Sequence, residues 1–130
     1  MGHREPSFKF PAFGGTFLGY DYGEFYGGLF FKAEDNTIYE ILSENIVGIY
    51  RSGNELFVFT GLNHLLINEG SIYKIENISN TRPEAKKIEN LSGRPYEIFP
   101  IEEKGISFKV KGECHEINFV APNIVKPCAP

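Results

Sequence analysis

Several residue types and patterns are scarce or missing in this chain, and each absence removes a class of protein. The 130 residues contain no tryptophan, and no run of 18 apolar residues predicts a membrane-spanning helix. Basic residues number 13 against 17 acidic ones, so the formal net charge is −4. This balance argues against nonspecific nucleic-acid binding, which needs lysine and arginine to neutralise phosphates. It fits a basic protein partner instead.

Cysteine is also scarce, with Cys114 and Cys128 alone. We expect two free thiols, because Cys128 lies in residues 126–130, a proline-rich stretch typical of a poorly structured tail. A disulfide that holds this tail is the alternative, and the spacing permits both. Residues 1–6 lack the apolar core of a signal peptide, so we expect a cytoplasmic protein. The alternative is that residues 1–3 are a cloning remnant and a leader has been removed, which leaves a periplasmic location as the second possibility.

Motifs that would identify an enzyme are missing too. No Gly-x-Ser-x-Gly element occurs, and the glycines of residues 23–28 are not followed by the Lys-Ser/Thr pair of a phosphate-binding loop. Cys114 adjoins His115, but successive strand residues point to opposite faces, so His115 is poorly placed as its base. His115 and Glu113 share a face, which is typical of a surface pair. His64 has no adjacent metal-ligating or catalytic partner, so a small hydrolase is the weakest hypothesis. We expect no catalysis, no metal and no cofactor.

The chain does contain short alternating segments separated by turn residues. No helical period outweighs this alternation, and the connections are too short for crossover helices, so the sheets should be antiparallel. We predict one all-β domain over residues 1–130, with an irregular segment at 1–15 that lies across the body as an edge piece and a proline-rich tail at 121–130. About ten strands are expected, at residues 17–22, 29–32, 37–42, 46–50, 55–60, 71–78, 85–91, 96–99, 105–110 and 113–120.

Two segments nearly repeat each other, at residues 36–41 and 70–75, with a weaker third copy at 113–117. A strand that recurs at this kind of period is typical of stacked small sheets such as propeller blades. Grouped in fours, the strands of residues 46–91 complete one blade, with half a blade before them and most of another after. We therefore predict an open, partial β-propeller-like fold of about two to three blades. A two-sheet β-sandwich is the alternative, since it uses the same alternation.

An aromatic and acidic stretch at residues 20–28 is the best candidate for a binding surface. Tyrosine and phenylalanine favour interfaces, and acidic residues steer a basic partner. A second acidic group lies at residues 97–103. The structural alternative for both is that the rings belong to the core and the acids to a solvated face. The candidate partner-binding residues are Tyr20, Asp21, Tyr22, Glu24, Phe25, Tyr26, His64, Glu97, Glu102 and Glu103.

In size, acidity, aromatic loops and lack of a catalytic motif, the chain resembles the small acidic β-rich immunity proteins of contact-dependent growth inhibition systems. The resemblance implies a noncatalytic inhibitor that blocks the cleft of a basic toxin, often a nuclease, with carboxylates and rings. The repeated Ile-Tyr-x-Ile segments resemble short propeller repeats instead. That implies a ligand- or sugar-binding module completed by oligomerisation, although the tryptophan on which such modules usually stack sugars is absent.

Overall fold

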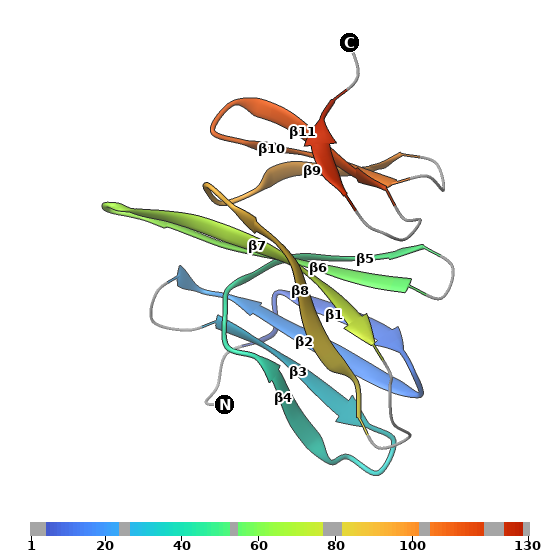
Figure 1. Cartoon of the computed structure of the whole chain (residues 1–130). Coiled ribbons are helices and arrows are strands. Elements are labelled where there is room, and N and C mark those ends of the chain that lie inside the picture. The colour runs from blue at the N-terminus through green and yellow to red at the C-terminus, as the bar shows by residue number, and fades with distance from the viewer. Residues whose placement is uncertain are drawn as a thin grey trace.

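A computed structural model of the chain describes residues 5–23, 27–52, 55–76, 82–101, 105–118 and 124–128. These residues form twelve β-strands in three sheets and no helix (Figure 1). No helix in this part of the chain is therefore long and apolar enough to cross a bilayer. The strands are β1 (Phe8–Ala12), β2 (Gly15–Asp21), β3 (Gly27–Ala33), β4 (Ile38–Leu42), β5 (Ile46–Ser52), β6 (Glu55–His64), β7 (Ile67–Glu76), β8 (Glu84–Leu91), β9 (Tyr96–Ile101), β10 (Gly105–Val110), β11 (Glu113–Asn118) and β12 (Val125–Pro127).

Each sheet is an open antiparallel meander of four consecutive strands. Sheet A contains β1–β4, sheet B contains β5–β8, and sheet C contains β9–β12. The all-β, antiparallel prediction is confirmed, and the four strands predicted between residues 46 and 91 form sheet B. The three sheets pack in layers, as in a sandwich, and none of them closes on itself.

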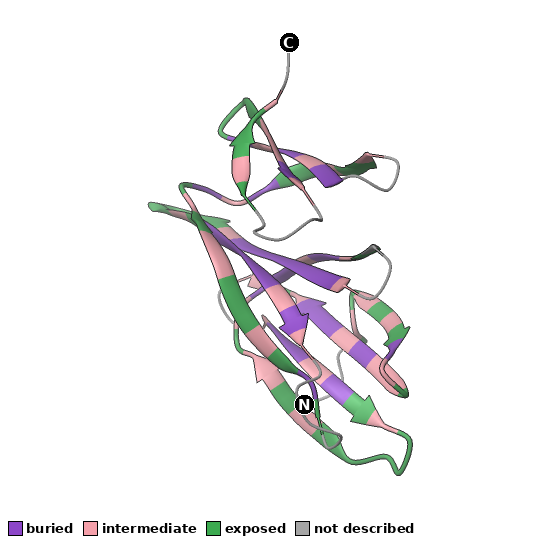
Figure 2. Ribbon diagram, turned by 45° about the vertical axis from the view of Figure 1, so that its right-hand side comes forward, coloured by how far each residue is buried: buried purple, intermediate pink, exposed green. Residues whose placement is uncertain are grey.

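Sheet B is the middle layer, which the alternation in β6 explains. Leu56 and Val58 point into a core shared with sheet A, whereas Phe57 and Phe59 point into a second core shared with sheet C. As a result β6 is buried without interruption over residues 56–61 (Figure 2). A strand covered on both faces must be apolar at successive positions, because neither face meets water.

Aromatic rings fill much of both cores. In the core between sheets A and B, the ring centroids of Phe17 and Phe31 lie 4.9 Å apart. In the core between sheets B and C, Phe59 and Phe108 meet edge to face at 5.2 Å. Such pairs contribute about 0.5–1.5 kcal/mol beyond the area they bury. Phe17 and Phe31 are register partners on β2 and β3 and stabilise sheet A itself, whereas Phe59 and Phe108 join sheet B to sheet C and help to fix how these two layers pack.

The two ends of the chain are more regular than the sequence predicts. Residues 1–15 were expected to be irregular, but β1 pairs with β2 from Phe8↔Gly19 to Ala12↔Gly15. It is an edge strand, as the expected edge piece implies. Near the other end, β12 pairs with β11 within the predicted tail. Both strands contain proline, which an outer strand tolerates because the missing N–H costs no ladder bond.

The free-thiol prediction is wrong. Cys114 and Cys128 form a disulfide, with their Cα atoms 5.5 Å apart. The backbone N–H of Cys128 also donates to the carbonyl of Cys114 at 3.2 Å. The bond therefore fastens the end of β12 to β11, and the predicted loose tail is held at this point.

The sequence repeat does not mark equivalent places in the three sheets. Its second and third copies lie on β7 and β11, the third strands of their sheets along the chain. Its first copy lies on β4, the fourth strand and an edge of sheet A. The likeness thus reflects the shared alternation of half-buried strands, while the three-meander architecture comes from the turn spacing.

Candidate binding cleft

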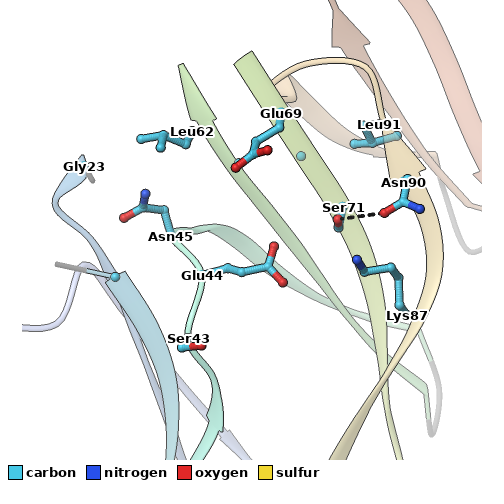
Figure 3. Close-up of a pocket in the computed structure, with 13 residues that line it drawn as sticks. Gly23, Ser43, Glu44, Asn45, Leu62, Glu69, Ser71, Lys87, Asn90 and Leu91 are labelled. Carbon is cyan, nitrogen blue, oxygen red and sulfur yellow. Dashed lines mark hydrogen bonds between the residues drawn. The ribbon is translucent and has the colours of Figure 1, made fainter. Parts of the chain in front are cut away.

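A polar cleft of about 520 Å³ opens at one end of the layers formed by sheets A and B (Figure 3). Its walls come from the segment just after β2, the start of β3, the β4–β5 connection, the second half of β6, the first half of β7, and β8. The charged and polar side chains on which its chemistry depends are Glu44, Asn45, Glu69, Ser71, Lys87 and Asn90.

Glu44 is the most firmly positioned of these side chains. Its Oε1 accepts a hydrogen bond of 2.9 Å from the Thr60 hydroxyl, and its Oε2 accepts one from the Tyr73 hydroxyl. Both donors belong to sheet B and are buried. Burial, together with the hydrogen bond to Glu44 and its charge, raises the pKa of the Tyr73 hydroxyl well above its ordinary value. Tyr73 therefore stays protonated and holds the carboxylate in place.

Asn45 lies beside this carboxylate and is 7% exposed. Its backbone carbonyl accepts a hydrogen bond from the Gly61 N–H, which joins the β4–β5 connection to β6. Its side-chain Oδ1 is buried and has no hydrogen-bond partner in the described part of the chain. A Cβ atom at Gly27 would lie 2.3 Å from this oxygen, so only glycine fits there. An unpaired buried acceptor is costly, and this oxygen packs against the start of β3 rather than facing the open part of the cleft.

Charges of both signs line the remaining walls. Glu69 is exposed on β7, and Lys87 places its Nζ 5.6 Å from the centre of the Tyr73 ring. The Ser71 hydroxyl donates to Asn90 Oδ1 at 3.5 Å. Two carboxylates against one ammonium leave the cleft with net negative charge. Carboxylate and amide oxygens accept hydrogen bonds from guanidinium and ammonium groups, so the arrangement suits a cationic guest.

The residues predicted between 20 and 26 divide among several roles. Tyr20 is only 2% exposed and packs edge to face on Phe30, so it belongs to the core, which corrects its assignment to the binding surface. Asp21 is engaged in a bidentate ion pair with Arg94, at 2.7 and 3.0 Å. Tyr22 is at the surface, and its hydroxyl donates to the Glu5 carbonyl at 2.6 Å.

The other predicted residues are scattered. His64 is exposed at the end of β6, and Glu97 on β9 forms a 2.8 Å ion pair with Lys109. That hydrogen bond raises the pKa of Lys109 above its ordinary value. The predictions for Glu24, Phe25, Tyr26, Glu102 and Glu103 lie outside the described residues.

Sequence reasoning missed Glu44, Asn45 and Glu69 as cleft residues. The available signal was the polar run of residues 43–45 between two apolar strands, which reads as an ordinary turn. In the part of the chain that the structure describes, no three His, Cys, Asp or Glu side chains gather in a way that could hold a metal ion.

In comparisons with known proteins, no protein-family model, no curated sequence and no solved structure matches this chain.

Proposed function

We propose that this protein is a noncatalytic inhibitor that binds a basic protein, as an immunity protein binds its toxin. The observation that carries the proposal is the cleft beside sheets A and B, in which the Glu44 carboxylate is held by two hydroxyl donors and Glu69 adds a second negative charge. Its volume of about 520 Å³ is sufficient for lysine or arginine side chains of a partner.

Preorganisation is the physical reason why this cleft suits a cationic side chain. The Thr60 and Tyr73 hydroxyls fix Glu44 before any guest arrives, so little conformational entropy is lost on binding. A guanidinium group in the cleft would form charge-assisted hydrogen bonds with Glu44. Lys87 reduces the negative charge of the cleft, but its ammonium group also interacts with the Tyr73 ring.

The carboxylates proposed to bind the partner are those of Glu44 and Glu69, in place of Asp21. Because Asp21 is paired with Arg94, reversing its charge would disturb the fold before it disturbed a partner. The described cleft residues include no aromatic ring on which a sugar could stack. No observation on these residues therefore favours the sugar-binding alternative.

The disulfide bears on where such an inhibitor would work. Disulfides form and persist in oxidising compartments and are rare in the cytosol. We therefore place the protein outside the cytoplasm, in a periplasmic or extracellular compartment, in preference to the cytoplasm expected from the sequence. A basic, secreted toxin, with a nuclease as the first candidate, is the partner class that the proposal specifies.

The test first uses the tagged chain to recover its partner from the source cells. The purified partner is then titrated with the chain. Isothermal titration compares wild type with Glu69→Gln and with the control Glu40→Gln, an exposed glutamate on β4 outside the cleft. We expect Glu69→Gln to weaken binding about 10-fold, as loss of one charge-assisted contact implies. Glu40→Gln should bind as wild type does, and higher salt should slow association.

A second readout is the partner's own activity. Nuclease activity should fall to background when the chain is added at a 1:1 ratio. The proposal fails if no basic protein binds, or if Glu69→Gln and Glu40→Gln bind with the same Kd as wild type. A partner whose activity survives saturation with the chain would also overturn the inhibitor role.

A further inference from the structure

The hairpin formed by β6 and β7 extends beyond its own sheet. These strands have ten residues each, and they pair as far as His64↔Ile67. The pairing of β5 with β6 begins at Ile46↔Thr60, and that of β8 with β7 at Gly70↔Leu91. Residues 62–69 therefore project from the sheet as a two-stranded ribbon (Figure 1).

The tip of this ribbon, defined as Leu65, Leu66 and Ile67, is apolar and exposed. Leu65 is 87% exposed, Leu66 fully exposed and Ile67 42% exposed. Leu65 also has a φ of 56°, in the left-handed region that a two-residue hairpin turn normally assigns to glycine or asparagine. The fold gains nothing from leucines in water at a strained turn, and strain of this kind concentrates at functional sites.

The tip continues the surface of the cleft. Leu62 and Glu69 are register partners, and both line the cleft. Side chains alternate along a strand, so His64 and Ile67, the pair two positions further out, lie on the same face. A partner that fills the cleft is therefore brought against Ile67 and the two leucines.

We propose that the tip is an apolar anchor that inserts into a hydrophobic pocket of the basic protein bound by the cleft. The inference rests on the proposed function. Charge favours this occupant over an anionic membrane, because residues 62–69 contain Glu69 but no lysine or arginine, and the chain carries a net charge of −4. Size disfavours a second copy, because three side chains offer far less than the roughly 800 Å² per partner of a stable interface. Apolar anchors that fill pockets are typical binding hot spots.

The test uses the basic protein purified in the titration above, with a variant that improves the turn. Leu65→Gly/Leu66→Asn supplies the residues that a positive φ at the first turn position favours. We expect an unchanged or higher urea midpoint, and binding to the basic protein about 100-fold weaker. The control is Ile38→Ser, which removes a 48% exposed side chain on β4 and should leave the Kd within about twofold of wild type.

Each other result has a definite meaning. If Glu69→Gln weakens binding but the tip variant binds as wild type, the anchor is wrong and the proposed function stands. If the tip is needed for binding to a partner that is not basic, the proposed function fails instead. If wild type binds phosphatidylcholine vesicles and the tip variant does not, the tip is a membrane contact and the anchor is wrong. If wild type is a dimer in sedimentation equilibrium and the tip variant is a monomer, the tip is a contact between two copies of the chain and the anchor is wrong. If no protein binds, both proposals fall.

Discussion

At the residue scale, two hydrogen bonds fix the Glu44 carboxylate where it lines the cleft. The carboxylate belongs to the β4–β5 connection, whereas its donors Thr60 and Tyr73 belong to sheet B. This arrangement ties a polar turn to the core of the middle layer. It also gives the Glu44 side chain two roles, in binding and in stability, so its partners Thr60 and Tyr73 affect both.

Tyr73→Phe should lower the free energy of unfolding by about 1–2 kcal/mol, because it removes a donor from the partly buried Glu44 carboxylate. Urea denaturation measures the change. Tyr96→Phe is the control, since Tyr96 is an exposed residue whose hydroxyl accepts a hydrogen bond from the Gly112 N–H, and it should cost less than about 0.5 kcal/mol. Equal losses in the two variants would show that the Tyr73 hydroxyl has no special role.

The raised pKa of Tyr73 predicts a loss of stability in alkali. The hydroxyl keeps its proton in the folded chain but loses it near pH 10 in the unfolded chain. The stabilisation is therefore complete below about pH 10 and is lost as the pH rises further. Between pH 9 and 11, wild-type stability should fall more steeply than that of Tyr73→Phe. Parallel profiles would contradict the prediction.

Single residues also show why the candidate site was hard to predict. Tyr20 and Tyr22 are two positions apart on one side of the same chain segment, yet one is buried and the other is at the surface, because β2 ends between them at Asp21. Glu44 and Glu69 come from separate connections and strands. Nothing in the sequence indicates that these segments meet, because strand pairing alone brings them together.

At the scale of elements, the edge strands explain most of the errors about the chain ends. Pro11 in β1 and Pro127 in β12 suggest irregular backbone when read alone. Both strands lie at the outside of their sheets, where one side of the backbone needs no partner. The central strands lack proline and were easier to place, although the strands predicted at 55–60 and 71–78 missed the ribbon by which β6 runs on to His64 and β7 begins at Ile67.

Removing the disulfide should weaken the hold on β12. For Cys114→Ser/Cys128→Ser we expect the free energy of unfolding to fall by about 2–4 kcal/mol, because the cross-link closes a short loop in the unfolded chain. Urea denaturation with and without dithiothreitol measures this loss. Wild type should become as unstable as the variant when reduced, while the variant should not respond. A reductant-insensitive wild type would contradict the prediction.

At the scale of the whole molecule, Arg94 links all three sheets. It lies just before β9 of sheet C and forms a bidentate ion pair with Asp21 of sheet A. Its Nη1 also donates to the Gly61 carbonyl of sheet B at 2.7 Å, and its backbone N–H donates to Asn68 Oδ1 at 2.7 Å. One side chain thus fixes how the layers meet beside the cleft.

Arg94→Lys should lower the free energy of unfolding by about 1–2 kcal/mol, because an ammonium group cannot reproduce the planar, two-pronged contact. The matched control is Arg51→Lys, whose exposed guanidinium donates a 3.3 Å bond to the Pro11 carbonyl and lies 5.4 Å from the centre of the Phe10 ring. Lysine keeps a positive charge near that ring, so this change should cost under about 0.5 kcal/mol. Chemical denaturation compares the two. Equal effects would show that the bridge among the sheets adds nothing beyond a surface contact.

The layered arrangement was only partly predictable for a related reason. The run of residues 56–59 is apolar at every position, which indicates a strand covered on both faces. The sequence does not say which elements cover it. Propeller-like and sandwich-like packing use the same alternation, so the choice depends on contacts between residues far apart in the chain.

The arrangement of each sheet as four consecutive strands has a consequence for synthesis on the ribosome. Sheet A can complete its hydrogen-bonded pairing once Leu42 has left the ribosome, since none of its ladders needs later sequence. The apolar face of sheet A is nevertheless covered only after β6 has formed, because one face of β6 packs on sheet A and the other packs on sheet C. The nascent chain therefore exposes the apolar face of sheet A until sheet B emerges, and this is the interval in which chaperones would be most useful.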